Sequence, residues 1–307
     1  MEMRSFGKTG LTVSALGFGG GPVGYLETDR REVANILNTI LDRGVNLIDT
    51  AAAYAGSEEA IGGAIGHRRD DYVLVSKCGR AYDDIEGKAW SALAIEQTIE
   101  RSLRRLKTDH LDVMLLHSCD LETLQRGEAV GALVKACDAG KIRFAGYSGD
   151  NAAASYAVGL EEIAVLETSV NICDQANIDT VLPAATQNNV GVLAKRPIAN
   201  AAWRAASEQR GMYVDYTRTY RERLDRMAVS PADLGLADEA WSEIALRFTL
   251  SQPGVTTAIV GTTKAANVER NLAVLAKGAL PDNAVRELRA AFQRAEAAMG
   301  EPWLGLT

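Results

Sequence analysis

Four side chains of complementary acid–base chemistry stand in separate segments of this sequence. They are Asp49, Tyr54, Lys77 and His117. A tyrosine hydroxyl has a pKa of about 10 and is a poor acid at neutral pH. A lysine ammonium beside the hydroxyl favours the phenolate and lowers that pKa, while a carboxylate beside the lysine keeps the ammonium charged in an apolar interior. Asp49 can therefore hold Lys77, and Lys77 can tune Tyr54.

The same four residues can polarise and protonate a carbonyl group. His117 offers a second donor to a substrate oxygen, or shares a proton with the phenol of Tyr54. None of the four side chains is a good source of hydride, so reduction of a carbonyl would need a cofactor.

Three of these residues end short apolar runs, which are typical of buried parallel strands. Asp49 ends the first run, Lys77 the second and His117 the third. Eight such candidate strands occur along the chain: Ala15–Phe18, Asn46–Asp49, Tyr72–Lys77, Leu111–His117, Phe144–Ser148, Val165–Ser169, Gly191–Lys195 and Thr257–Val260. Between them lie helical patterns: Arg31–Arg43, Glu58–Gly66, Ile95–Leu106, Thr123–Ala139, Ala152–Gly159, Asp179–Asn188, Asp238–Ser251 and Asn267–Leu275.

Eight strand–helix units predict an α/β fold of the (β/α)8 TIM-barrel type, with the polar strand ends gathered at its mouth. A doubly wound sheet is the main rival, but the glycines from Gly17 to Gly24 lack the dinucleotide fingerprint expected after its first strand. We expect residues 1–307 to form one domain. Three segments are additions to the barrel: a hairpin over residues 3–14, a long insertion after the seventh strand (Trp203–Ala237, with a helix at Asp215–Met227) and a C-terminal helix at Asp282–Met299.

Composition restricts the class of protein. The chain has 307 residues, 47% of them hydrophobic and 24% charged, with a net charge of −7. This charge gives no general attraction to nucleic acid or to an anionic membrane. The N-terminal residues lack the apolar core of a signal peptide, and the four cysteines show no metal-type spacing. We therefore expect a cytoplasmic protein with free thiols and no metal site, either a monomer or a homo-oligomer.

A phosphate site is predicted after the eighth strand. Gly261, Thr262, Thr263 and Lys264 follow that strand, and a helix beginning near Ala265 carries Asn267, Arg270 and Asn271 in its first two turns. Backbone N–H groups at a helix start bind phosphate, and the hydroxyls and the lysine add to this. Phosphate sites at this position are common in barrels.

Motifs across nearly the whole chain resemble those of the aldo-keto reductase family. Gly44–Ala51, Tyr54, Ser57-Glu58 and Ile61-Gly62 resemble its first signature, and Ser102–Asp109 followed by Leu111-Asp112 and Leu115–His117 is similar to its second. Gly146–Ser148 resembles the turn after the fifth strand, and Gly261-Thr262 with Asn271-Leu272 resembles the nucleotide segment.

The resemblance implies reduction of aldehydes or ketones by NADPH, with NADH as an alternative cofactor, or the reverse oxidation of alcohols, including sugars. It makes Asp49, Tyr54, Lys77 and His117 the catalytic tetrad, with Tyr54 as general acid. Ser148 would contact the nicotinamide amide. The residues implied at the adenosine-phosphate end are Gly261, Thr262, Thr263, Asn267, Arg270 and Asn271.

Several positions depart from the family pattern. Gly149 stands where an asparagine is usual, and Glu167 where a glutamine is usual. A carboxylate at Glu167 can still accept from the amide, but it adds charge beside the nicotinamide. Lys195 and Arg196 stand where an aromatic residue often stacks on the ring. At the phosphate end, Asn267 replaces the usual arginine, so the choice between NADP and NAD stays open.

Two other functions remain compatible with the same residues. Lys77 could form a Schiff base in a lyase or aldolase, although Asp49 opposes the neutral amine that this needs. Alternatively, the protein could be an NADPH-binding regulatory subunit with slow turnover. The substrate would lie among loops at the mouth, where Tyr25, Tyr82 and Trp203 are candidate lining residues.

Overall fold

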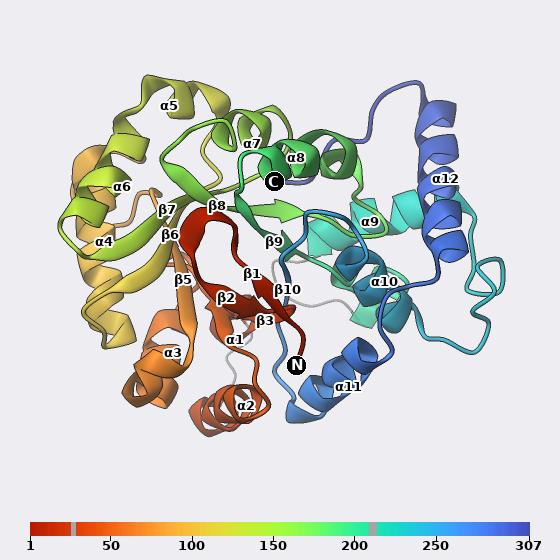
Figure 1. Ribbon diagram of the computed structural model, residues 1–307, viewed down its shortest axis with the longest axis horizontal. Helices are drawn as coiled ribbons and strands as arrows, with labels where there is room; N and C mark the ends of the chain where they lie inside the picture. Colours follow the sequence, from red (N-terminus) through yellow and green to blue (C-terminus); the bar gives the residue numbers. More distant parts are fainter. Residues whose placement is uncertain (26–28, 209–213) are drawn as a thin grey trace.

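The computed structural model describes residues 1–25, 29–208 and 214–307 (Figure 1). Parallel strands close a barrel in the order β10-β3-β4-β5-β6-β7-β8-β9. Their bounds are β3 Leu16–Gly19, β4 Leu47–Asp49, β5 Val73–Cys78, β6 Leu111–His117, β7 Ile142–Ser148, β8 Ile163–Ser169, β9 Gly191–Lys195 and β10 Thr257–Val260. The predicted (β/α)8 barrel and its eight strands are confirmed.

The barrel strands are apolar on both faces because both faces are covered. Every residue of β5 and of β6 is buried, as expected for parallel strands between a packed interior and an outer ring of helices. Val75, Val113 and Leu193 belong to the cluster inside the barrel, whereas Leu74 and Met114 belong to the larger cluster beneath the helices. This alternation directs successive side chains of one strand to opposite faces.

Helices surround the barrel and follow its strands in turn (Figure 1). The helix α4 shows how the sequence sets one of them: Ser91 caps its first turn by accepting from the backbone N–H of Ala94, and Ile95 and Ile99 are buried on its inner face. The bounds of the helices are α1 Gly21–Tyr25, α2 Arg30–Asp42, α3 Ser57–Ile65, α4 Ala92–Leu106, α5 Leu121–Arg126, α6 Glu128–Asp138, α7 Asn151–Ala157, α8 Ala176–Gln187, α9 Val214–Met227, α10 Trp241–Leu250, α11 Ala265–Ala276 and α12 Asp282–Met299.

The prediction of one continuous helix over residues 123–139 is wrong. Gly127 has a φ of 76° and divides this segment into α5 and α6. Its left-handed conformation ends α5, and its N–H donates to the carbonyl of Leu124. Glycine adopts this conformation without a steric penalty, so one glycine breaks a pattern that otherwise predicts continuous helix.

The expected hairpin is confirmed and lies across one end of the barrel. Strands β1 (Met3–Ser5) and β2 (Thr12–Ser14) pair antiparallel, and Figure 1 shows them in front of the barrel. Phe6 is fully buried and belongs to the interior cluster. Gly7 has a φ of 57°, and a Cβ there would lie 2.3 Å from the backbone N of Gly191. The hairpin therefore packs backbone to backbone against the start of β9.

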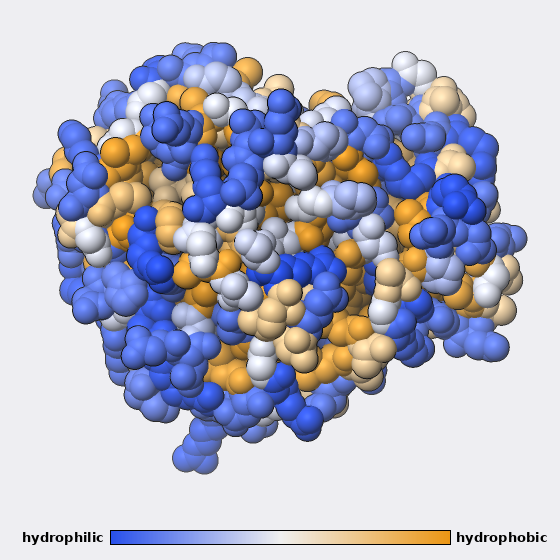
Figure 2. Space-filling model, viewed as in Figure 1, coloured by the Kyte–Doolittle hydropathy of each residue, from blue (hydrophilic) through white to orange (hydrophobic). Residues whose placement is uncertain are grey.

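On this side of the molecule, Figure 2 shows hydrophilic residues over most of the surface.

The insertion between β9 and β10 and the C-terminal segment form a second apolar cluster. Tyr220 of α9, Phe248 of α10 and Phe292 of α12 belong to it, and α12 packs beside α9 at the right of Figure 1. Trp303 meets Phe292 edge to face. Among the described residues, no helix has the length and apolar character needed to span a bilayer.

Candidate active site

The four acid–base residues come together at the carboxyl ends of neighbouring strands. The Nζ of Lys77 lies 2.6 and 2.8 Å from the two carboxylate oxygens of Asp49 and 3.0 Å from the carbonyl oxygen of Thr50. The same ammonium is 5.2 Å from the ring centroid of Tyr54, and that ring meets the imidazole of His117 edge to face, with the centroids 5.9 Å apart. The structure therefore places all four in one cluster.

Burial and charge set the protonation states within this cluster. Burial opposes the charge of Lys77, but the carboxylates of Asp49 and Glu167 outweigh it and raise the pKa of the lysine. Burial also raises the pKa of Asp49 well above its usual range; Glu167 adds to that rise and Lys77 opposes it. For His117, burial and the nearby Lys77 hold the imidazole pKa well below its usual value. The imidazole is therefore neutral at neutral pH, and its Nδ1 has no hydrogen-bond partner among the described residues.

Glu167 is a fifth member of the cluster. It lies on β8 and is 2% exposed, with its Oε2 3.0 Å from the Nζ of Lys77. Its register partner on β7 is Ser148, so both residues expected near the nicotinamide stand at the same level of the barrel. Sequence reasoning placed Glu167 beside the cofactor but missed its ion pair with Lys77, because that pairing depends on how strands opposite each other align across the barrel.

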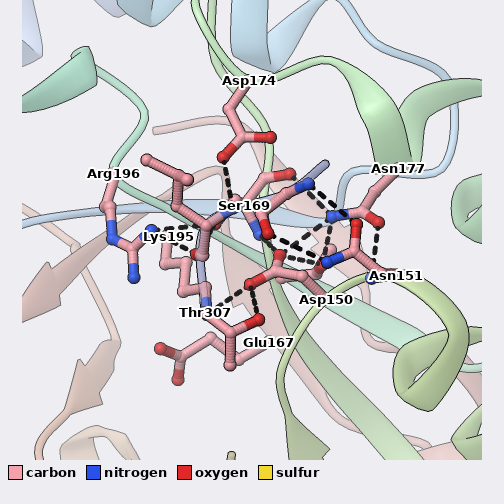
Figure 3. Close-up of polar contacts among 12 residues, drawn as sticks. Asp150, Asn151, Glu167, Ser169, Asp174, Asn177, Lys195, Arg196 and Thr307 are labelled. Atoms are coloured by element: carbon pink, nitrogen blue, oxygen red, sulfur yellow. Dashed lines mark hydrogen bonds and ion pairs between the residues drawn. The ribbon is translucent and has the colours of Figure 1, made fainter. Parts of the chain in front are cut away.

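A second buried ion pair lies beside this cluster. Lys195, at the end of β9, is 2.9 Å from Asp150, and Figure 3 shows the network around them. The carboxylate of Asp150 also accepts from the backbone N–H of Ser169 at 2.7 Å and from the Asn177 amide at 2.9 Å. Burial would raise the pKa of Asp150, but the charges of Lys195 and Arg196 and the hydrogen bond from the Ser169 N–H outweigh it and lower that pKa. Lys195 is thus a partner of Asp150.

The segment 304–307 covers part of the mouth. Asn151 forms two hydrogen bonds with the backbone of Gly305, at 2.7 and 2.9 Å. Arg196 donates to the carbonyl oxygen of Leu306 at 2.5 Å, and the Thr307 hydroxyl donates to Asp150 at 3.1 Å (Figure 3). Sequence reasoning missed this segment, which has neither helical nor strand periodicity. Its one local signal is Gly305, where a Cβ would lie 2.9 Å from the Cβ of Asp150.

Asp174 ties the same segment to the insertion after β9. It is fully buried and accepts from the Tyr220 hydroxyl and from the backbone N–H of Leu306, both at 3.0 Å. Burial, aided by the charge of Asp150, raises the pKa of Asp174 to about 7. Arg196 lies 3.9 Å from the ring centroid of Tyr216, so its guanidinium faces the insertion and the C-terminal segment.

The residues predicted to bind phosphate lie together where α11 begins. The Thr262 hydroxyl accepts from the backbone N–H of Lys264 at 3.1 Å and from the Asn267 amide at 3.0 Å. Arg270 donates to the Asn267 side chain at 3.3 Å. No side chain caps α11, and its first turn carries no acidic residue. The positive end of the helix dipole is therefore open to an anion. The neighbouring predicted residues are Gly261, Thr263 and Asn271, each partly exposed.

Two of the three candidate substrate residues have structural partners. The ring of Tyr82 packs under the guanidinium of Arg101, 4.1 Å from its carbon, and Trp203 stacks on Trp241 with centroids 6.3 Å apart. The side chain of Tyr25 lies outside the described part of the molecule. No cluster of metal-ligating side chains is present in the described ranges.

Comparisons with known proteins agree on one family. The sequence model of the Aldo/keto reductase family matches residues 15–292. An L-galactose dehydrogenase of Arabidopsis thaliana is 27% identical over 90% of this chain and 88% of its own. An aldo-keto reductase of Bacillus halodurans, solved in its holo form, superposes with a TM-score of 0.78 at 25% identity, covering 95% of this chain and 96% of the other. An aldo/keto reductase of Klebsiella pneumoniae, solved with NADP and acetate, gives 0.74 at 28% identity, covering 94% and 95%.

Proposed function

Because the chain belongs to the aldo/keto reductase family, we propose that it exchanges hydride between NADP(H) and a small aldehyde, ketone or corresponding alcohol. The observation that carries this proposal is the buried cluster of Lys77, Asp49, Tyr54 and His117. Hydride transfer to a carbonyl carbon needs a proton for the oxygen, and these side chains meet that need.

The residues of the mouth fit a dinucleotide phosphate. At one end, Lys264 and Arg270 bring positive charge to the uncapped start of α11, which suits a phosphate group. At the other end, Ser148 and Glu167 offer a hydroxyl and a carboxylate at the same level as Lys77. Bound NADPH would supply the hydride that the protein's own side chains lack.

In this proposal Tyr54 gives its proton to the carbonyl oxygen during reduction and takes it back during oxidation. Lys77 stabilises the tyrosinate that forms, and Asp49 holds the ammonium in place at 2.6 Å. His117 is neutral, because its pKa is lowered, so its ring can donate a hydrogen bond to the same oxygen without repelling Lys77.

Substitution of Tyr54 tests this function. Tyr54→Phe should lower kcat at least about a hundredfold, because it removes the general acid, while the dissociation constant for NADPH stays within about twofold. Fluorescence titration with NADPH and NADH and steady-state assays on a carbonyl panel give both quantities. Tyr156→Phe, on the helix α7, is the matched control and should leave both unchanged. Wild-type kcat in the Tyr54 variant would refute the role.

A sugar alcohol or sugar hemiacetal is the second candidate substrate class. It is favoured by the L-galactose dehydrogenase that the chain resembles over most of its length. Oxidation of an aldose panel with NADP⁺ and NAD⁺, compared with reduction of simple aldehydes, separates the two classes.

Schiff-base chemistry at Lys77 is less favourable. Attack on a carbonyl needs the neutral amine, and the two carboxylates beside Lys77 raise the pKa of its ammonium. Borohydride treatment in the presence of a carbonyl substrate should therefore leave Lys77 unmodified. A trapped adduct would favour the lyase.

A further inference from the structure

One ammonium and two carboxylates meet in the cluster around Lys77. The lysine is 2.6 Å from Asp49 and 3.0 Å from Glu167, and each of the three side chains is at most 3% exposed. One ammonium can neutralise one carboxylate. With both carboxylates ionised, the trio carries one net negative charge in an interior that water does not screen.

Within the described parts of the chain, Lys77 is the one cation that forms an ion pair with Asp49 or Glu167. Arg196 is directed instead to the carbonyl of Leu306 and the ring of Tyr216. Lys195 has its own carboxylate partner, Asp150, at 2.9 Å. His117 is neutral. Arg80 is exposed, so solvent screens its charge. Asp49 contacts the ammonium with both oxygens, so Glu167 carries the excess charge once both carboxyls are ionised. Burial and this charge together raise the pKa of Asp49, and the excess is therefore fully present only in alkaline solution.

The reaction limits how far a nicotinamide ring could lie from this charge. Hydride transfer requires the ring carbon and the carbonyl carbon to be about 3–3.5 Å apart, and the carbonyl oxygen must contact Tyr54. The lysine that tunes Tyr54 also contacts Glu167. The ring and the Glu167 carboxylate are therefore near neighbours in a buried site.

We propose that Glu167 makes this site select the oxidised form of the cofactor. The inference rests on the proposed function. The oxidised nicotinamide ring carries a positive charge and the reduced ring carries none, so the carboxylate attracts one form and leaves the other almost unaffected. In a buried site with an effective dielectric constant of about 20, one such charge beside the ring corresponds to at least about tenfold in affinity.

Such selectivity has a direct consequence for hydride transfer. Tighter binding of the oxidised cofactor makes the bound reduced cofactor a stronger hydride donor, and it slows release of the oxidised cofactor relative to the reduced one. Glu167 thereby acts on the cofactor through its field and takes no proton in the reaction.

The test compares Glu167→Gln with the wild-type protein by isothermal titration calorimetry. NADP⁺, NADPH, NAD⁺ and NADH are titrated separately in mildly alkaline buffer, which favours ionised carboxyls. The substitution keeps the size of the side chain and removes its charge. We expect the oxidised cofactor to bind about tenfold more weakly to the variant, with the affinity for the reduced cofactor changed by about twofold or less.

Two further variants make the result specific. Glu162→Gln removes the same charge from an exposed position directly before the first residue of β8. It should leave the affinities for both oxidation states unchanged. Glu167→Asp keeps the charge and should retain the preference for the oxidised form. Circular dichroism checks that each variant folds.

The outcomes separate this inference from the proposed function. Equal weakening of both oxidation states in Glu167→Gln, or of neither, overturns the inference while the hydride-transfer function stands. Failure of the wild-type protein to bind any of the four cofactors overturns both. If the variants do not fold, the wild-type protein alone still tests the inference. Tighter binding of the reduced cofactor than of the oxidised cofactor would contradict it.

Discussion

At the scale of single residues, the site depends on buried charges that hold one another. Lys77 and Asp49 would each be costly to bury alone, and together they satisfy most of each other's bonding capacity. The same logic explains Asp150, which is buried among Lys195 and several neutral donors. Asp174 differs, because its two hydrogen-bond donors are neutral and burial raises the pKa of its carboxyl to about 7.

The raised pKa of Asp174 predicts a pH-dependent stability. In an unfolded chain the pKa of this carboxyl is about 3.9. Between that value and about 7, the folded protein holds a proton that the unfolded chain has lost. The contribution of Asp174 to the free energy of unfolding therefore falls as pH rises through this window and is constant above it. Its charged surroundings are Asp150, Arg196 and Arg223.

Asp174→Asn should remove this dependence, because the amide is neutral at every pH and its oxygen can still accept from Tyr220 and Leu306. We expect the variant to melt at a higher temperature than the wild-type protein at about pH 8, with the difference shrinking towards about pH 5. Thermal denaturation followed by circular dichroism at several pH values measures it. A difference that is constant across this range would contradict the assignment.

At the scale of elements, strand ends position the chemistry and glycines set how closely helices pack. Gly62 on α3 lies against the backbone of α4, and a Cβ there would stand 2.3 Å from the carbonyl oxygen of Arg105. The adjacent Gly63 faces open space. The two glycines share a helix but meet different surroundings.

These neighbouring glycines predict opposite effects of one substitution. Gly62→Ala should destabilise the protein by about 1–3 kcal/mol or more, because α4 must move to admit the methyl group. Gly63→Ala should stabilise it by about 0.5–1 kcal/mol, through the higher helix propensity of alanine. Urea denaturation of both variants gives the two free energies. If both substitutions changed the free energy of unfolding equally, α4 could move away from α3 without loss of stability.

The sequence predicts elements better than contacts. Strands β4, β5 and β6 were predictable because each contains an apolar run that leads into a polar residue, and Asp49, Lys77 and His117 were placed at one rim on that basis. The pairing of Lys77 with Glu167 was not predictable, because it depends on side chains that meet across the barrel interior. The break at Gly127 was missed, since the apolar spacing continues on either side of it.

At the scale of the whole molecule, both ends of the described chain pack against the barrel. The hairpin of β1 and β2 lies across one end, and the segment 304–307 reaches the mouth beside Asp150. Gly305 allows this, because its backbone lies against Asp150 and Asn151 too closely for a side chain. Such a segment has no periodic pattern of apolar residues, so its docking could not be predicted from the sequence.

Gly305→Val should release the segment from the mouth. Its side chain would overlap the Cβ of Asp150, so the hydrogen bonds to Asn151, Asp174 and Arg196 would be lost together. We expect a lower melting temperature and faster proteolytic removal of the final residues, measured by mass spectrometry. Leu304→Ala is the control, because that side chain is 58% exposed and the hydrogen bond from Arg223 is accepted by its backbone carbonyl. Equal protease resistance in all three proteins would show that the segment stays docked.

Closure of the barrel has a consequence for the order of folding. Strand β10 pairs with β3, which lies near the opposite end of the chain, whereas β4, β5 and β6 pair with close neighbours in sequence. Pairing across a long loop costs more chain entropy and comes later. Asp49, Lys77 and His117 would therefore gather on a local, still open sheet. Water would be excluded from them only when the last strand docks. The three residues would therefore come together early in folding, but their pKa values would shift only at its end.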